Sequence, residues 1–420
     1  MTSSDFLLAT WDGGGHAAPM LSIATALLAR GHRVRVLADP VLRSEVEASG
    51  AVFVPWHEAP HRANACERIT AVVADWEARS PAQAGALLRD RLVCGPARMF
   101  AADCRRELRR RPADVVAADH LLPGALVAGA AEGARTAAVA TTVLGIPHWG
   151  VPAAGVGARP ARGIAGRTRN ALLARLFTRA WARGLPAYNA ARVANGLDPV
   201  TDPVALVAGW DRTLVLTSAA LEFGEWAPPA HVRIVGARLD DPAWVAPWHP
   251  PQDGTPLVLA SLSSTYMDQA EVLARVAAAL GRLDVHGLVT TGPAIDPDQI
   301  AAPPNVRVVR SAPHTRVLRH AAAVVTHGGH GTVAKTLAAG VPLLTLPLGR
   351  DQPDVAARVV AAGAGLRLPR QSSAERIADG VGRLLAEPTF RASAGRLAQA
   401  MAAERREDLA VRELEALASA

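Results

Sequence analysis

Cysteine is scarce in this sequence of 420 residues. The three cysteines, Cys66, Cys94 and Cys104, are an odd number, and no two of them have C-x-x-C spacing. Disulfide frameworks use even numbers of cysteines, and structural zinc sites use closely spaced pairs. The sequence therefore predicts neither kind of site, and we expect the protein to lie in the reducing cytoplasm.

Long hydrophobic runs are also missing. The longest weakly polar region, residues 121–147, is interrupted by Glu132, Arg135 and Pro147, so it falls short of the ~20 apolar residues that a membrane-spanning helix needs. The first residues contain no basic stretch ahead of an apolar segment, and no secretory signal is predicted. We expect a soluble protein without a membrane span.

Lysine is nearly absent, because Lys335 is the only lysine in the chain. The formal net charge is nevertheless +7, from 45 Lys+Arg against 38 Asp+Glu. Proteins that bind nucleic acid gather their basic residues on one face or in one stripe. Here the arginines are spread through the whole chain, so we expect no nucleic-acid partner.

What the sequence does contain is enough apolar material, 50% of its residues, for two domains of ~200 residues each. Strand and helix patterns alternate twice, and a proline-rich region separates the two series. Such alternation is typical of parallel sheets with helices on both faces. We predict an α/β fold of two doubly wound, Rossmann-like domains that face each other across a cleft. The predicted parts are an N-terminal domain at 1–223, a linker at 224–256, a C-terminal domain at 257–387 and one long helix at 388–420.

The most informative stretch is residues 322–359, where an apolar strand, a glycine-rich turn, a helix and a second strand follow one another. The turn reads T-H-G-G-H-G-T at residues 326–332, and the stretch includes the pair Asp351-Gln352. Glycines let a ligand approach the backbone, and the helix that follows offers unpaired N–H groups and the positive end of its dipole. This pattern predicts a phosphate site. The alternative is a plain tight turn with a packed histidine, which would not require the polar pair nearby.

A second phosphate motif overlaps the first. Residues 329–336 are close to the P-loop pattern, with Lys335 and Thr336 at its end. Ala334, however, stands where the pattern requires a glycine, and its Cβ would obstruct a loop wrapped around phosphate. We therefore do not expect a P-loop NTPase.

A candidate catalytic pair lies in the first half. His16 follows the first predicted strand within Gly15-His16-x-x-Pro19, and Asp119 ends the strand-like residues 113–119. The carboxyl ends of parallel strands meet at one edge of a sheet, so these two side chains are expected to lie together. A neutral imidazole held by a carboxylate can take the proton from an attacking hydroxyl. The alternative for Asp119 is a helix N-cap, and one carboxylate can fill both roles.

Together these motifs resemble the GT-B fold glycosyltransferases that decorate natural products such as macrolides, enediynes and aromatic polyketides. The resemblance covers nearly the whole chain as a layout. It rests on the T-H-G-G-H-G-T run, the Asp351-Gln352 pair, Ala312-Pro313-His314 and the Gly-His-x-x-Pro motif. The resemblance implies inverting, metal-independent sugar transfer with His16 as base and Asp119 as its partner. It also implies that the last helix crosses back onto the N-terminal domain.

The resemblance further implies which residues bind the donor, a nucleotide sugar that serves as co-substrate, with no other cofactor. The chain departs from the family at Ser311, where many relatives have a tryptophan that stacks on the nucleobase, and at Val355, where many have asparagine. The choice between a dTDP-sugar and a UDP-sugar therefore stays open, and deoxysugars fit. The expected donor-binding residues are Ser263, Thr265, Ala312, His327, Gly329, Gly331, Thr332, Asp351 and Gln352.

The acceptor, a small-molecule aglycone, is expected on the N-terminal side, where residues 56–100 and 141–190 form long irregular segments. Their large apolar side chains could line a pocket for a bulky ligand, although for each residue taken singly ordinary helix packing is the better explanation, so we expect only some of them to face the ligand. The candidates are Trp76, Met99, Phe100, Trp149, Phe177 and Trp181.

Two other functions remain open at this stage. A sugar-nucleotide 2-epimerase would have the same architecture and would also bind diphosphate, but it would need no acceptor pocket. A noncatalytic partner of a glycosyltransferase is disfavoured because His16, Asp119 and Asp351-Gln352 are all present. The sequence leaves a homodimer open.

Overall fold

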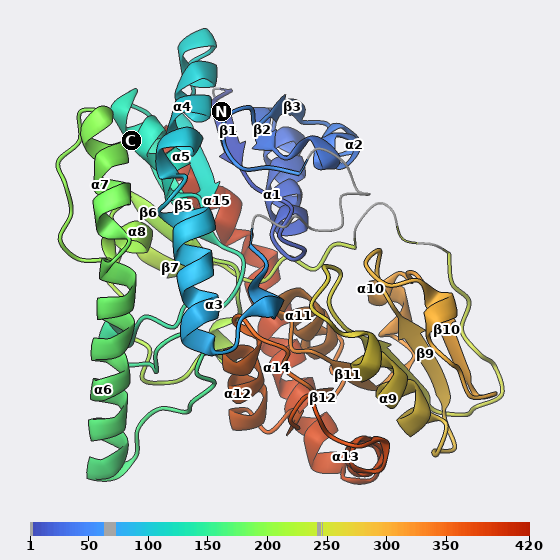
Figure 1. Cartoon of the computed structure of the whole chain (residues 1–420). Helices are drawn as coiled ribbons and strands as arrows, with labels where there is room; N and C mark the ends of the chain where they lie inside the picture. Colours follow the sequence, from blue (N-terminus) through green and yellow to red (C-terminus); the bar gives the residue numbers. More distant parts are fainter. Residues whose placement is uncertain (1–2, 63–72, 242–244, 246) are drawn as a thin grey trace.

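The computed structural model describes residues 3–62, 73–241, 245 and 247–420. Cys66 and part of the predicted linker lie outside these residues. The chain forms two parallel sheets, each covered by helices on both faces (Figure 1). The predicted α/β class with two doubly wound domains is therefore confirmed.

The N-terminal sheet has seven strands in the order β3-β2-β1-β4-β5-β6-β7, all parallel. Successive residues of β1 alternate between two cores, with Leu7 in one and Phe6 and Leu8 in the other. Burial of both faces explains why the central strands are almost entirely apolar. The strands are β1 (Asp5–Ala9), β2 (Arg33–Ala38), β3 (Val52–Pro55), β4 (Val115–Asp119), β5 (Arg135–Ala140), β6 (Arg212–Val215) and β7 (Val232–Ile234).

Helices of several lengths connect these strands. Residues 56–100 and 141–190 were expected to be irregular, but their described parts contain α3, α6, α7 and the start of α4. The helix α6 runs along the outer edge of the molecule (Figure 1) and buries none of its residues, so its hydrophobic pattern was too weak to predict it. The helices are α1 (Ala17–Ala29), η1 (Pro40–Leu42), α2 (Arg43–Ala48), η2 (Asp75–Glu77), α3 (Pro81–Leu88), η3 (Arg89–Val93), α4 (Ala97–Arg110), α5 (Pro123–Ala131), η4 (Pro147–Trp149), α6 (Gly163–Ala182), α7 (Leu185–Ala194), α8 (Ala205–Ala208) and η5 (Ala219–Leu221).

The C-terminal sheet has six strands in the order β10-β9-β8-β11-β12-β13, again all parallel. Strand β8 alternates in the same way, with Leu257 and Leu259 in one core and Val258 in the other. The strands are β8 (Leu257–Ser261), β9 (His286–Thr290), β10 (Val306–Val309), β11 (Ala321–Thr326), β12 (Leu343–Thr345) and β13 (Gly365–Arg367).

The helices of this half include a pair at the end of the chain that was expected to be one long helix. They are α9 (Ala270–Leu280), η6 (Pro297–Gln299), α10 (His314–Val317), α11 (His330–Ala338), α12 (Gln352–Ala361), α13 (Ala374–Ala386), α14 (Pro388–Glu407) and α15 (Leu409–Ala418).

The break between α14 and α15 lies at Asp408, whose φ of 45° is left-handed. Helix α14 packs on the C-terminal core through Leu397 and Met401, whereas α15 packs into the N-terminal core. Figure 1 shows α15 in red among the blue and green elements of the first half. The chain thus returns to the N-terminal domain, and the change of direction explains why two helices replace one.

The predicted linker also needs correction. Strand β7 lies within residues 224–256 and pairs in parallel with β6, with Val232 buried in a small core beside Trp149. The N-terminal sheet therefore extends beyond residue 223. A three-residue strand among prolines gives too short a pattern to be predicted from sequence.

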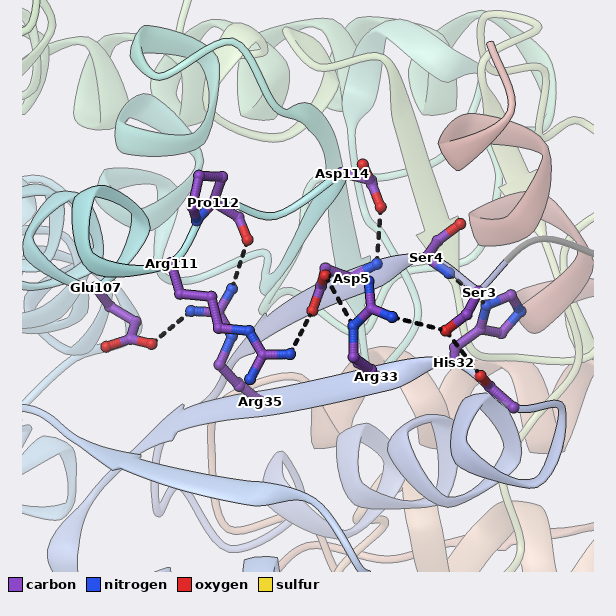
Figure 2. A network of polar contacts seen from close by, with 11 residues as sticks. Ser3, Ser4, Asp5, His32, Arg33, Arg35, Glu107, Arg111, Pro112 and Asp114 are labelled. Atoms are coloured by element: carbon purple, nitrogen blue, oxygen red, sulfur yellow. Dashed lines mark hydrogen bonds and ion pairs between the residues drawn. The ribbon is translucent and has the colours of Figure 1, made fainter.

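The amino ends of β1, β2 and β4 form a dense polar network (Figure 2). Asp5 accepts hydrogen bonds from Arg33 Nη2 at 2.6 Å and from Arg111 Nη2 at 2.9 Å. Beside it, the buried Arg35 pairs with Glu107 at 2.5 Å. These charges all find partners within the N-terminal domain, at the edge of the sheet away from His16.

Among the described residues, no helix is both long enough and apolar enough to cross a membrane.

Candidate active site between the two sheets

The residues predicted for catalysis and several of those predicted for donor binding lie where the order of strands reverses in each sheet. Strand β1 lies between β2 and β4, and β8 lies between β9 and β11. At such a switch point the connections leave in opposite directions, and ligands bind outside the carboxyl ends of the strands. His16 follows β1 and Asp119 ends β4, whereas Thr265 follows β8 and His327 follows β11.

Contacts join these two edges across the domains. A Cβ on Gly14 would lie only 2.8 Å from Cγ2 of Thr265. His330 Nε2 lies 3.0 Å from the hydroxyl oxygen of Thr217, at the end of the N-terminal sheet. The Thr142 hydroxyl donates to Asp351 Oδ2 at 2.5 Å. These contacts bring the carboxyl edges of the two sheets together, with the turns that carry His16 and His330 on facing sides.

His16 and Asp119 form a close pair. The distance between His16 Nδ1 and Asp119 Oδ2 is 2.7 Å, and the Thr141 hydroxyl oxygen lies 3.0 Å from the same nitrogen. An Nδ1–H that donates to the carboxylate leaves the lone pair on Nε2. The His16 side chain is 17% exposed, whereas its partner Asp119 is buried.

Asp119 is fully buried. Burial by itself raises the pKa of this carboxyl, but the positive charge and hydrogen bonds of His16 and His120 outweigh burial and lower the pKa well below its ordinary value. Oδ1 also accepts a hydrogen bond from the backbone N–H of Leu121 at 2.9 Å. Leu122, not Asp119, is the N-cap residue of α5. The carboxylate thus supports both the imidazole and the local turn, without being the helix cap.

The turn after β1 fixes the imidazole from its other side. The Trp11 ring lies 5.1 Å from the His16 ring, measured between centroids. A Cβ on Gly13 would lie 2.4 Å from the Trp11 ring and 2.7 Å from His16 Cδ2. Only glycine fits here, because two aromatic rings occupy the space that a side chain would need.

The glycine-rich turn after β11 has the geometry expected of a phosphate site. Gly329 is the N-cap of α11, and Gly328 adopts a left-handed φ of 91°. A Cβ on Gly331 would meet nothing within 4 Å, so this position is open to a ligand. Thr332, in the first turn of α11, is partly exposed. Lys335, which a P-loop would direct at phosphate, instead pairs with Asp241 at 2.8 Å.

Two histidines flank this turn and are held neutral. Burial lowers the pKa of His327 to about 4; the Asp351 carboxylate opposes this shift and the Arg350 guanidinium adds to it. Burial likewise lowers the pKa of His330 to about 4. A neutral imidazole can donate one hydrogen bond to a phosphate oxygen without carrying a charge.

The loop after β8 is held by its own hydroxyl groups. Ser263 Oγ lies 3.1 Å from Thr265 Oγ1 and accepts a hydrogen bond from the Thr265 backbone N–H at 3.2 Å. Ser263 is buried, whereas Thr265 is partly exposed toward the other domain. The Ala312 side chain lies in the C-terminal core, which leaves only its backbone to meet a nucleobase.

Asp351 and Gln352 do different things although they are neighbours. Gln352 is buried, and its Oε1 accepts hydrogen bonds from the backbone N–H groups of Leu348 at 2.7 Å and Gly349 at 3.1 Å. Gln352 therefore shapes the loop between β12 and α12, whereas Asp351 extends from that loop to Thr142.

The residues predicted to bind the acceptor are not brought together. Phe100 is wrong as a pocket residue, because its ring is fully buried and packs edge-on against Trp56 at 5.0 Å. Trp149 is 4% exposed and packs against Trp226. Met99 is 48% exposed on α4.

The remaining acceptor candidates lie on other elements. Trp76, in η2, packs edge-on against Tyr266 of the C-terminal domain, with 5.5 Å between the ring centroids. This candidate therefore lies between the two domains. Phe177 and Trp181 contact each other on α6.

Sequence reasoning missed Thr141, Thr142 and Thr217, which interact with His16, Asp351 and His330. Each follows the end of a buried strand by one or two residues. That position was the available signal, because polar residues directly after parallel strands face the ligand edge of the sheet.

Similarity to known proteins adds to this geometry. Residues 274–417 match the family described as erythromycin biosynthesis protein CIII-like, C-terminal domain. The chain is 31% identical over 415 residues to 4'-demethylrebeccamycin synthase of Lentzea aerocolonigenes, which covers 94% of this chain and 95% of the relative. It is 34% identical to the TDP-daunosamine transferase DnrS of Streptomyces peucetius, over 42% of this chain and 43% of the relative.

Solved structures share the fold along the whole chain. The calicheamicin glycosyltransferase CalG4 superposes with a TM-score of 0.75 at 23% identity and covers 99% of this chain and 98% of its own. The glycosyltransferase VinC, in complex with dTDP, superposes with a TM-score of 0.70 at 22% identity over 99% of both chains.

Proposed function

The chain belongs to the natural-product glycosyltransferases of the GT-B fold, and from this premise we propose that it transfers a sugar from a nucleoside diphosphate to a hydroxyl group of a hydrophobic aglycone. The observation that carries the proposal is the 2.7 Å contact between His16 Nδ1 and Asp119 Oδ2 opposite the phosphate-type turn of α11.

In the proposed reaction His16 is the general base. Its Nε2 takes the proton of the acceptor hydroxyl while that oxygen attacks the anomeric carbon, and the Asp119 carboxylate stabilises the imidazolium that forms. Attack from the side opposite the leaving group inverts the configuration at the anomeric carbon. The buried carboxylate also fixes the tautomer, because it accepts the Nδ1–H.

The leaving nucleoside diphosphate is proposed to occupy the start of α11. Backbone N–H groups of Gly329, Gly331 and Thr332 and the imidazole of His327 would donate to its oxygens, and the helix dipole favours its negative charge. Since these groups can stabilise the leaving charge, we expect full activity in excess EDTA. A strict requirement for Mg²⁺ would contradict this part of the proposal.

A dTDP-deoxysugar is the donor class that the comparisons favour. One relative is named as a TDP-daunosamine transferase, and one structural neighbour is described with dTDP. The relatives are named as a synthase and a transferase, which disfavours the 2-epimerase alternative.

The test is product analysis by mass spectrometry with dTDP- and UDP-sugars against a panel of polyketide aglycones, followed by NMR of the anomeric proton. Nucleoside diphosphate should appear only when an aglycone is added, and the product should have the inverted configuration. Release of free nucleotide without any acceptor would favour an epimerase or a hydrolase instead, and a retained configuration would remove His16 from the proposed role.

A further inference from the structure

Arg350 reaches from the C-terminal domain to the N-terminal one. It lies in the loop between β12 and α12, directly before Asp351, and it has a left-handed φ of 57° that only glycine adopts readily. Strained backbone of this kind clusters at ligand sites, where the surrounding structure holds the side chain in a required direction.

The Arg350 guanidinium makes a two-pronged contact with the opposite domain. Nε donates to Asp75 Oδ2 at 2.7 Å and Nη2 donates to Asp75 Oδ1 at 2.8 Å. Asp75 belongs to η2 of the N-terminal domain, and its side chain is 8% exposed. A bidentate, partly desolvated contact is also the way in which arginine binds a phosphate group.

The position of Arg350 places it beside the proposed donor site. Its Nη1 lies 3.4 Å from Thr265 Oγ1, on the loop after β8. Burial lowers the pKa of His327, on the turn after β11, and the positive charge of Arg350 lowers this pKa further. The guanidinium therefore contacts the loop after β8 and acts electrostatically on the turn after β11, the two segments that are proposed to surround the diphosphate.

The neighbouring residue, Asp351, also contacts a protein group that resembles part of a ligand. Asp351 accepts a hydrogen bond from the Thr142 hydroxyl, as it would from the hydroxyl of a sugar. Arg350 binds the Asp75 carboxylate, as it would bind a phosphate. Two adjacent side chains are thus each paired with a group of the N-terminal domain that has the chemistry of one part of a nucleotide sugar.

We propose that Arg350 binds the diphosphate of the donor, and that Asp75 occupies the guanidinium when no donor is present. Donor binding then exchanges one bidentate anion for another, and it releases the ion pair between Asp75 of η2 and the C-terminal domain. Asp75 thus competes with the donor for Arg350. The affinity for nucleotide is therefore lower than it would be without the Asp75 carboxylate. The inference rests on the proposed function, because it requires a nucleoside diphosphate in this site.

The test measures binding of dTDP and UDP to the full chain by calorimetry. Arg350→Gln should weaken binding about tenfold or more, because a charged bidentate partner is lost. Asp75→Asn should tighten binding about three- to tenfold, because the competing carboxylate is gone. The double variant should bind like Arg350→Gln alone. Thymidine and uridine, which lack phosphate, should bind equally to all variants.

Glu77→Gln is the matched control, since it removes an equal charge from an exposed position of the same helix η2 and should leave the affinity unchanged. The two substitutions are expected to change the nucleotide affinity in opposite directions. This difference distinguishes competition from an ion pair that only holds the two domains together. If Asp75→Asn weakens nucleotide binding or leaves it unchanged, Asp75 does not compete and the inference is wrong. If the unaltered protein binds neither dTDP nor UDP, the proposed donor class fails as well.

Discussion

The two edges of the N-terminal sheet differ in where their polar groups find partners. At the amino edge, Asp5, Arg33, Arg35 and Glu107 pair with one another inside one domain (Figure 2). At the carboxyl edge, residues such as Thr142 and Thr217 reach the other domain. Partners within one domain are permanent once it has folded, whereas partners across domains can be exchanged for a ligand. The first edge therefore serves stability, and the second is the edge where we propose that the substrates bind.

The largest effect is expected at the carboxyl edge. His16→Ala removes the proposed base, so kcat should fall by about 10³-fold. The substitution also leaves the buried Asp119 carboxylate without its imidazole partner, so the melting temperature should fall as well. Steady-state kinetics and thermal unfolding together check this result. Near-normal turnover of a folded His16→Ala protein would show that another group takes the proton.

At the amino edge, a single substitution should lower the stability of the protein without changing its activity. Glu107→Gln removes the charge that faces the buried Arg35, and we expect a loss of about 3 kcal/mol in the free energy of unfolding. Urea unfolding measures the loss, and kcat of the folded protein should stay normal. The double variant Arg35→Met with Glu107→Leu should recover most of the stability, because no buried charge is then left alone. A drop in kcat for the single variant would show that the two edges are coupled.

Acidification should change the stability of the two domains in opposite directions. His327 and His330, with pKa values lowered by burial to about 4, bind protons more readily when unfolded, since the ordinary value is about 6.5. The C-terminal domain therefore loses stability as the pH falls from 6.5 toward 4, and each histidine contributes at most about 1.4 kcal/mol to this loss for every pH unit. Asp354, whose pKa burial raises to about 6, offsets part of this loss.

The N-terminal domain responds in the opposite direction. Burial raises the pKa of Asp39 to about 7, so the folded carboxyl takes up a proton before the unfolded one does. Its contribution to stability is present at low pH and is lost as the pH rises through about 7. Hydrogen–deuterium exchange at pH 7 and pH 5, corrected for intrinsic rates, should show selective loss of protection in β8 to β12. Equal loss in both sheets would contradict the comparison.

The smallest effect is expected for Asp5→Asn. Its partners Arg33 and Arg111 are about half exposed, and exposed ion pairs contribute roughly 0.5–1 kcal/mol. The change should be measurable by urea unfolding only at low salt, because salt screens such pairs. A loss of transfer activity would show that this edge does more than support the sheet.

Much of the fold was predictable because it depends on local patterns. The central strands are buried on both faces and read as apolar runs, and the glycine-rich turn has a fixed relation to the strand before it and the helix after it. Helix α6 and strand β7 escaped prediction for the opposite reason. The first buries none of its residues, and the second is three residues long.

The site was predictable only in part. The contact of His16 with Asp119 was predictable because both residues lie at the carboxyl ends of neighbouring strands. The acceptor candidates are not brought together, because an aromatic side chain in a helix gives no sign of whether it faces a ligand or the core. Phe100 and Trp149 face the core. Contacts such as Arg350 with Asp75 join residues far apart in the chain, and no local pattern reports them.

The return of α15 to the first half has a consequence for biosynthesis. Val411, Leu414 and Leu417 complete a core whose other walls are made by β1, β2 and α1. A ribosome that adds ~5–20 residues per second delivers this last wall on the order of ten seconds after β7 has emerged. Until then the nascent N-terminal half exposes the apolar surface that α15 later covers.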